Sequence, residues 1–156
     1  MPPIRPRPAP RRFVPTNQLL AALPKTDRER LLKHCRRYRL DFAQVLCEPG
    51  ARVRHVYFPN RGLISFLTPV QGGAGVEVGM VGREGFAGIP LFLGVRTSPV
   101  KWLVQGTGEA LRIQANDFAK ELARSRPLRE TLSRYLHTYI AQVAQTAACN
   151  SHHELG

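Results

Sequence analysis

The spacing of the apolar residues changes twice along the chain. Spacings of three and four, which indicate helices, mark residues 17–37 and the chain after Ile113. Between them, residues 38–113 form short runs rich in Val, Phe, Tyr, Leu and Ile. Turns that contain glycine or proline separate these runs at intervals of roughly 10 to 15 residues. This pattern predicts an α+β protein in which helices flank an antiparallel β-roll or jelly roll.

Two short helices are predicted before the strands. Asn17 is placed to cap a helix over 18–23. Thr26 and Glu29 have the spacing of a capping box, which predicts a second helix over 27–37. Both helices are expected to lead directly into the β region.

The chain after the strands predicts a short helix from Asn116 and a long helix from Pro127. Apolar residues recur along the long helix at spacings of three and four. We assign this stripe to dimerisation: Leu128, Leu132, Tyr135, Leu136, Tyr139, Ile140, Val143 and Ala147. One small β-domain covers only part of such a long stripe, so the remainder is expected to pack on the same helix of a second chain. The alternative is that the whole stripe packs on the domain's own core.

The first 16 residues are predicted to form a basic arm. Proline and arginine dominate this segment, and proline disfavours both helices and central strands. The whole chain has a formal net charge of +12, and 11 of its 23 lysines and arginines lie within residues 1–40. Such an arm either contacts nucleic-acid phosphates without sequence specificity or only keeps the chain in solution.

Several classes of protein are not expected from this sequence. It has no run of about 18 apolar residues to span a membrane, and its N-terminus lacks the apolar core of a secretory signal, so a cytoplasmic protein is predicted. Cys35, Cys47 and Cys149 are odd in number and far apart, which does not fit a disulfide framework. With His152 and His153, Cys149 supplies too few ligands for a metal site. No nucleophile–base pair or paired carboxylates stand out, so we expect no catalytic residues and no enzyme activity.

The most distinctive segment of the β region runs from Val81 to Gly94. Glycines at 82, 85, 88 and 94 are expected to reach positive φ and to approach a ligand closely. A short helix near 89–93 would direct its first amides at an anion such as a nucleotide phosphate. The candidate ligand-binding residues are Gly85, Gly88, Ile89, Leu91, Arg96, Ser98, Val100 and Lys101.

This order of elements resembles the sensor domain of the Crp/Fnr transcription regulators, a cyclic-nucleotide-binding-like domain. The resemblance covers about residues 17–150 and rests on the turn at 48–50, Val-Tyr-Phe-Pro at 56–59, the segment 85–94 and the ending at 142–153. It implies a homodimer formed through the C-terminal helix. In that family a winged helix-turn-helix domain follows this helix and binds DNA. No stretch of the given sequence resembles such a domain, so we expect no specific operator binding from these residues.

In family members that bind cyclic AMP or cyclic GMP, the resemblance implies a glutamate for the ribose hydroxyl and an arginine for the cyclic phosphate. Ile89 and Val100 stand at these two positions, and Lys101 lies one residue away, on the opposite face of a strand. Each lost charge-assisted hydrogen bond costs about 1.5 to 3 kcal/mol. We therefore expect no cyclic nucleotide cofactor. Four charged residues lie within or beside this segment, and each either replaces a missing partner or lies solvated on the surface: Arg83, Arg96, Glu77 and Glu84.

We predict the sensor and dimerisation module of a Crp/Fnr-type regulator, in which an unidentified effector at 82–102 shifts the helix over 127–149. His55 is the plausible haem ligand of the β-roll, and the N-terminus has no cysteine cluster for an iron–sulfur centre. One alternative is a stand-alone module that heterodimerises with a full-length regulator. Another is an enzyme on a cupin-like barrel, although the histidines lack that metal-binding pattern. The predicted domains are an arm over 1–16, a β-roll with flanking helices over 17–126, a dimerisation helix over 127–150 and a tail over 151–156.

Overall fold

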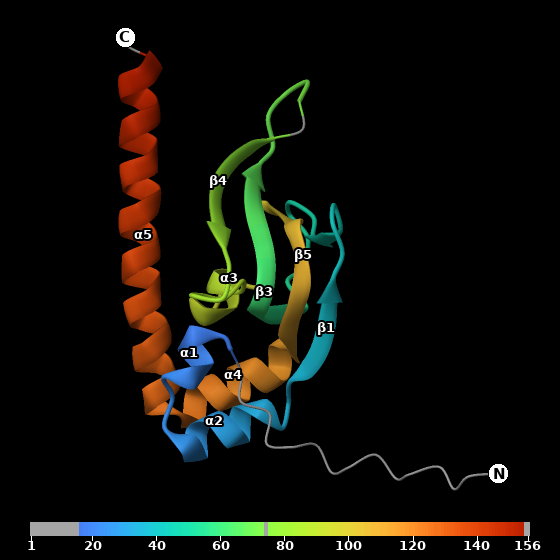
Figure 1. The fold of residues 1–156 in the computed structure, drawn as a ribbon, viewed down its shortest axis with the longest axis vertical. Helices are drawn as coiled ribbons and strands as arrows, with labels where there is room; N and C mark the ends of the chain where they lie inside the picture. Colours follow the sequence, from blue (N-terminus) through green and yellow to red (C-terminus); the bar gives the residue numbers. More distant parts are fainter. Residues whose placement is uncertain (1–15, 74, 155–156) are drawn as a thin grey trace, which may run out of the picture.

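The computed structural model describes residues 16–73 and 75–154, and shows a sheet with helices at one end and a long helix along its side (Figure 1). The arm predicted over 1–16 lies outside the described residues, except for Thr16. The predicted antiparallel β fold with flanking helices and a long C-terminal helix is confirmed. In chain order the elements are α1 (Gln18–Ala21), α2 (Lys25–Leu32), β1 (Arg36–Leu40), β2 (Val45–Cys47), β3 (His55–Thr68), β4 (Val76–Val81), α3 (Ile89–Phe92), β5 (Lys101–Gln114), α4 (Ala115–Arg124) and α5 (Arg126–Glu154).

The centre of the sheet is the pair of long strands β3 and β5. The strand order is β1–β5–β3–β4, and the short strand β2 also pairs with β5. The pairing of β3 with β5 shifts register between Pro59 and Ile64, and such bulges bend and twist a strand. Gly62, at φ +93°, lies within this bend, and a Cβ atom on Gly62 or Gly108 would overlap the backbone of the facing strand. These glycines therefore allow β3 and β5 to approach each other where the sheet bends.

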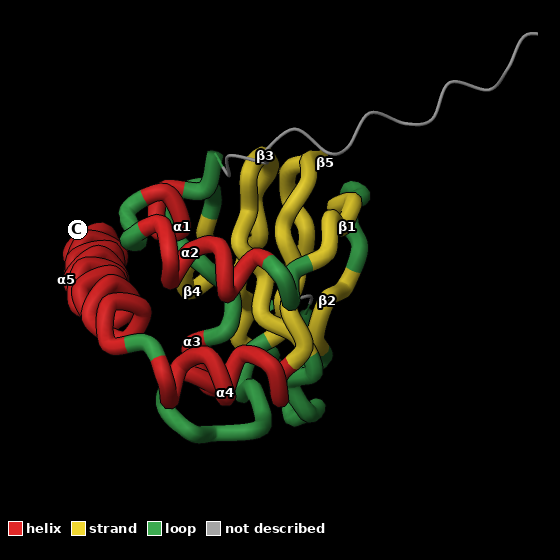
Figure 2. The backbone as a smooth tube through the Cα atoms, turned by 90° about the horizontal axis from the view of Figure 1, so that it is seen from below, coloured by secondary structure: helices red, strands yellow, loops and turns green. Residues whose placement is uncertain are grey.

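Buried side chains form two apolar clusters, whose removal from water is the main stabilising contribution. The first cluster joins the helices to one end of the sheet and includes Leu20, Leu31, Val56, Phe58, Phe86, Phe118, Leu128 and Leu132. The second lies on the sheet itself and includes Leu40, Tyr57, Ile64, Phe66, Val81, Trp102 and Val104. Tyr135 of α5 packs against both clusters. Figure 2 shows α1, α2, α3 and α4 between α5 and the β1 side of the sheet.

Asn17 caps α1 as predicted, and it also fixes the glycine-rich segment. Its Oδ1 accepts hydrogen bonds from the N–H groups of Leu19 and Leu20 at 3.1 and 3.3 Å. Its Nδ2 donates to the carbonyl oxygens of Pro59 and Gly85, both at 2.8 Å. The Asn17 side chain is completely buried, so these four bonds join α1, β3 and the loop after β4 in the interior.

The prediction for α2 is wrong at both ends. The helix begins at Lys25 with Pro24 at its N-cap, and Thr26 and Glu29 do not form the predicted capping box. The residues expected in its last turn instead open β1, where Arg36 pairs with β5. Backbone pairing with a central strand outweighs a helical pattern that has only a narrow apolar stripe.

α5 packs on its own domain at the start and leaves it towards the end. Leu128 and Leu132 are 1% and 0% exposed, whereas Ile140 is 58% exposed. The assignment of Leu128 and Leu132 to dimerisation is therefore wrong, because the core of the same chain covers them. α5 also continues to Glu154, so residues 151–154, which were expected to form a tail, are helical.

Candidate functional site

An apolar cavity of about 260 Å³ lies between the sheet and α5. Elements that are far apart in the sequence build its wall, and Figure 1 shows β4 and α3 beside α5. The lining residues are Phe66 of β3, Val78 of β4, Gly88, Ile89 and Pro90 at the start of α3, Ser98, Pro99 and Val100 before β5, Trp102 of β5, and Tyr139 and Val143 of α5. The long helix therefore forms one side of the cavity, opposite the face of the sheet.

The aromatic part of the wall is held in a fixed arrangement. Trp102 and Phe66 meet edge to face with ring centroids 5.9 Å apart, and Phe66 meets Tyr139 in the same way at 6.2 Å. Ser98 orients the indole, because its buried Oγ accepts a hydrogen bond from Trp102 Nε1 at 3.0 Å. The same Oγ accepts from the N–H of Val100 at 3.2 Å and donates to its carbonyl oxygen at 2.9 Å. All three hydrogen-bonding positions of the Ser98 hydroxyl are thus used within the protein.

Two tyrosines of α5 lie directly on glycines of the β4 region. A Cβ atom at Gly79 would overlap the hydroxyl of Tyr139, and one at Gly85 would overlap the ring of Tyr135. Burial raises the pKa of Tyr139. Burial also raises the pKa of Tyr135, and the charge of Glu84 adds to this effect. Both tyrosines are therefore neutral at physiological pH, and the glycines let α5 approach the sheet closely.

The glycines of the segment after β4 mainly leave room for neighbouring side chains, whereas the prediction was that they bring the backbone close to a ligand. Of the four glycines expected at positive φ, only Gly94 adopts it, at +79°. Gly88 has extended backbone, and a Cβ atom there would lie 2.7 Å from Cγ2 of Val56. Gly85 faces Tyr135 in a similar way. The prediction of positive φ is therefore wrong for three of the four, because these positions demand space rather than an unusual backbone conformation.

The predicted anion site at the start of α3 does not fit the cavity that the structure shows. α3 is only four residues long, and Pro90 in its first turn has no N–H to donate. Of the described side chains that line the cavity, none is charged. An anion at this place would be buried without a counter-charge, which is strongly unfavourable.

The structure brings together four of the eight candidate ligand-binding residues. Gly88, Ile89, Ser98 and Val100 line the cavity, and Leu91 packs against both apolar clusters instead. The other three candidates lie elsewhere: Gly85 under Tyr135, Arg96 on the exposed loop before β5, and Lys101 at the first position of β5, paired with Leu67.

The candidate ligand-binding residues omitted seven residues that line the cavity: Phe66, Val78, Pro90, Pro99, Trp102, Tyr139 and Val143. Trp102 and Pro99 follow immediately after the candidates, so an inward-facing alternation along β5 would have indicated the tryptophan. Tyr139 and Val143 were assigned to dimerisation because they belong to the stripe of α5. No local signal distinguishes Phe66 as a cavity residue from Phe66 as an ordinary core residue.

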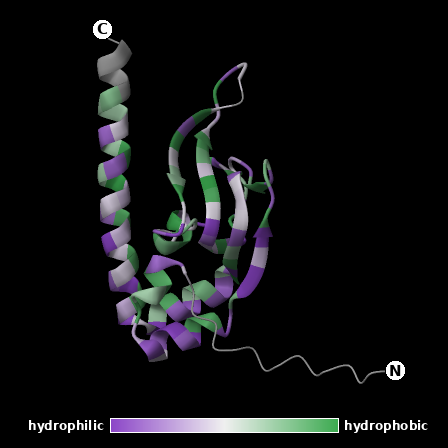
Figure 3. Cartoon of the chain, in the orientation of Figure 1, coloured by the Kyte–Doolittle hydropathy of each residue, from purple (hydrophilic) through white to green (hydrophobic). Residues whose placement is uncertain are grey.

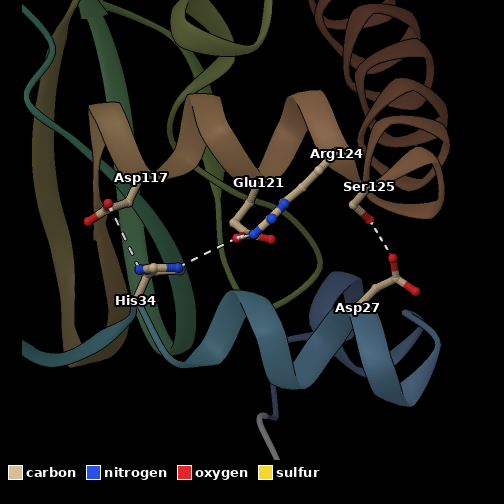
Figure 4. A network of polar contacts seen from close by, with 6 residues as sticks. All are labelled: Asp27, His34, Asp117, Glu121, Arg124 and Ser125. Carbon is tan, nitrogen blue, oxygen red and sulfur yellow. Dashed lines mark hydrogen bonds and ion pairs between the residues drawn. The ribbon is translucent and has the colours of Figure 1, made fainter.

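A polar network holds the base of α5 to the helices beneath it (Figure 4). The Ser125 Oγ donates to Asp27 Oδ1 of α2 at 2.8 Å and accepts from the N–H of Leu128 at 3.2 Å, so it caps α5. Glu121 of α4 is almost fully buried, and its Oε1 lies 3.5 Å from both His34 Nε2 and Arg124 Nη1. These contacts fix the orientation in which α5 leaves the domain.

The three cysteines are free thiols, and the cysteines and histidines form no metal-binding group within the described part of the chain. No group of three or more His, Cys, Asp or Glu residues is placed to hold a metal ion there, and the side chains of His152 and His153 lie outside the described residues. Burial raises the pKa of the Cys35 thiol to about 12, which makes it a poor nucleophile. Burial lowers the pKa of His55, and the charges of Arg112 and Arg54 lower it further.

Comparison with known proteins places the fold. No family model and no curated protein matches the sequence. The c-di-GMP-responsive global regulator CLP of Xanthomonas campestris matches with a TM-score of 0.68 and 19% identity, over 80% of this chain and 63% of its own. The catabolite activator protein of Thermus thermophilus matches with a TM-score of 0.67 and 14% identity, over 85% of this chain and 62% of its own. The sensor domain of the transcriptional regulator DNR from Pseudomonas aeruginosa matches with a TM-score of 0.63 and 15% identity, over 81% of this chain and 85% of its own.

These likenesses establish the fold that the sequence resemblance predicted, the cyclic-nucleotide-binding fold found in Crp/Fnr-type regulators. The chain spans less than two thirds of the length of the first two regulators, and most of the length of the DNR sensor domain. Within the described residues, no helix has both the length and the apolar character needed to cross a membrane.

Proposed function

We propose that this chain is the sensor and dimerisation module of a Crp/Fnr-type transcription regulator. One observation carries the proposal: the same helix, α5, forms a wall of the cavity through Tyr139 and Val143 and then extends beyond the domain. A molecule in the cavity would contact that helix directly. The structural neighbours are regulators and sensor domains, which agrees with a regulatory role without an enzymatic step.

The proposed dimer contact is the outward face of α5. Leu136, Ile140, Ala144 and Ala147 follow one another at spacings of four, four and three, which places them on one face of the helix. Ile140, Ala144 and Ala147 are exposed, and Leu136 is half-buried. Figure 3 shows that hydrophobic positions continue along α5 as far as its grey end. Small alanines allow two helices to approach closely, so a second copy of α5 suits this face.

The effector is proposed not to be a cyclic nucleotide. Ile89 and Val100, which replace the glutamate and arginine expected for a cyclic nucleotide, both line the cavity. Apolar side chains at these places offer no partner for a ribose hydroxyl or a cyclic phosphate. DNA binding would belong to a further domain after α5, and a cytoplasmic location follows from the same proposal.

Signal transmission through α5 requires that the ligand prefers one position of the helix over another. Tyr139 and Val143 supply this preference, because any shift of α5 changes their distance from Phe66 and Val78 on the sheet. The base of the helix is fixed by Ser125 and its partners, so a shift at Tyr139 would become a change of angle at the outer end. In a dimer, this would alter the spacing between the two outer ends.

The test is the mass of the protein in solution, measured by sedimentation equilibrium. We expect a dimer for the wild type and a monomer for Ile140→Glu, which places a charge in the proposed helix–helix contact. Gln145→Glu is the matched control, because Gln145 is exposed on another side of α5 and the change should leave the dimer intact. A wild-type chain that is monomeric at high micromolar concentration would refute the proposal.

A further inference from the structure

We propose that the cavity beside α5 binds a neutral, mostly apolar small molecule, and not a nucleotide or another anion. The inference rests on the proposed function for the consequence of binding, whereas the ligand class itself follows from the cavity wall. Phe66, Trp102 and Tyr139 supply aromatic surface, and Val78, Val100 and Val143 supply aliphatic surface. Binding of a ligand to such a wall is stabilised mainly by the removal of apolar area from water.

Ser98 and Tyr139 carry the two side-chain hydroxyls of the cavity wall, and that of Ser98 is already engaged. The hydroxyl of Ser98 is saturated by Trp102 and by both backbone groups of Val100, so a ligand can bond to it only by breaking one of these contacts. Replacing a hydrogen bond made within the protein by one to a ligand gives little net gain. Ser98 therefore shapes the cavity and does not select a polar ligand.

The nearby cations do not reach the cavity. Successive side chains of a strand point to opposite faces, so Lys101 points away from the face on which Trp102 lines the cavity. Arg96 is exposed on its loop, and its carbonyl oxygen accepts a backbone bond from Val53 at 2.8 Å. Neither residue lines the cavity. A phosphate placed here would lose its hydration without gaining a charged partner.

The cavity is open to solvent on one side, so its volume indicates how much of a ligand it can enclose. An apolar protein cavity of about 150 Å³ stays dry and accepts benzene, with its six carbon atoms. The present cavity has about 260 Å³. By proportion it accommodates roughly ten carbon atoms, such as a medium-length alkyl chain or a fused pair of rings. A cyclic nucleotide is both larger and charged.

The test uses Trp102, the single tryptophan of the chain, as its reporter. The purified chain is titrated with 1-octanol, with octyl phosphate and with cyclic AMP, and the tryptophan emission is recorded. The first two probes share the same alkyl chain and differ in charge. We expect a saturable change with 1-octanol and at least about tenfold weaker binding of octyl phosphate, because the phosphate would be buried unpaired. Equal or tighter binding of octyl phosphate or cyclic AMP overturns the inference, as does the absence of saturation with 1-octanol.

A pair of variants ties the signal to this cavity. Val100→Phe fills the space and should weaken 1-octanol binding at least about tenfold. Val95→Phe adds the same ring on an exposed loop outside the cavity and should leave binding unchanged. If Val100→Phe binds 1-octanol as the wild type does, the ligand lies elsewhere and the inference fails.

A second readout separates this inference from the proposed function. A spin label on the exposed Cys149 near the outer end of α5, with Cys35 and Cys47 replaced by alanine, reports the distance between two copies of the helix. If 1-octanol binds but does not change this distance, the ligand class stands and the proposed signalling fails. If an anionic probe binds and changes the distance, the signalling stands and the ligand class is wrong.

Discussion

The ring of Tyr135 on α5 occupies the space that a Cβ atom at Gly85 would need. Gly85 itself is buried, and its carbonyl oxygen accepts a hydrogen bond from Asn17 Nδ2 at 2.8 Å. The glycine therefore cannot move away from the helix without breaking a contact to α1. The position of α5 against the sheet depends on this missing side chain.

Gly85→Ala should destabilise the chain by about 1 to 3 kcal/mol, because the added methyl group overpacks a closed interior. Urea denaturation followed by circular dichroism measures the free energy of unfolding. Gly73→Ala is the control: Gly73 is exposed, and only the Val70 side chain lies near its Cβ position, so little change is expected. Equal stability of the wild type and Gly85→Ala would show that α5 does not require the close approach.

Ser98→Ala should both destabilise the protein and change the environment of Trp102. The substitution leaves Trp102 Nε1 buried without its acceptor, at a cost of about 1 to 3 kcal/mol. The free energy of unfolding and the wavelength of the tryptophan emission are the two measurements. Ser133→Ala, at an exposed position of α5, is expected to change neither. An unchanged emission in Ser98→Ala would contradict the role of Ser98 in orienting the indole.

Much of the fold could be predicted from the sequence because local chemistry determines it. The side chain of Asn17 caps α1 through its own next residues, so a short segment was enough to predict this cap. The alternation of strands and turns likewise gave the antiparallel class. Thr26 and Glu29 misled the prediction of α2. Arg36 belongs to β1 because it pairs with β5, and a pairing between segments so far apart in the sequence leaves no local pattern.

The cavity was harder to predict, because distant elements form it. Ile89 and Val100 were found through the family resemblance, whereas Phe66 and Tyr139 come from β3 and α5 and meet only in the folded chain. The apolar stripe of α5 was recognised, but its periodicity alone cannot tell which turn faces the domain and which faces outward. The burial of Leu132 and the exposure of Ile140 divide that stripe.

Leu132→Ala and Ile140→Ala should therefore affect different properties, the first the stability of the domain and the second the assembly of the dimer. Leu132 is completely buried in the first apolar cluster, so its truncation should cost about 2 to 5 kcal/mol of unfolding free energy. Ile140→Ala should leave the stability of the domain nearly unchanged at low protein concentration and weaken the dimer instead. Denaturation at low concentration and sedimentation at high concentration distinguish the two. A large loss of monomer stability in Ile140→Ala would contradict the division of the stripe.

The thiol of Cys35 makes the free energy of unfolding depend on pH in the alkaline range. Burial raises its pKa from 9.0 to about 12 in the folded chain. Below pH 9 both the folded and the unfolded states hold the proton, so the stabilising contribution is fully present. Between pH 9 and pH 12 the unfolded state has lost this proton while the folded state retains it, so the free energy of unfolding falls as the pH rises.

Cys35→Ala removes this titration and should therefore lose less stability than the wild type between about pH 7.5 and about pH 10.5. Urea denaturation at the two pH values gives the comparison within each protein, which cancels the constant cost of the lost side chain. The buried tyrosines titrate alike in both proteins, so the difference reports Cys35. Cys149→Ala, on the exposed part of α5, should behave as the wild type does. Equal alkaline losses in the wild type and Cys35→Ala would show that the thiol is not held protonated by burial.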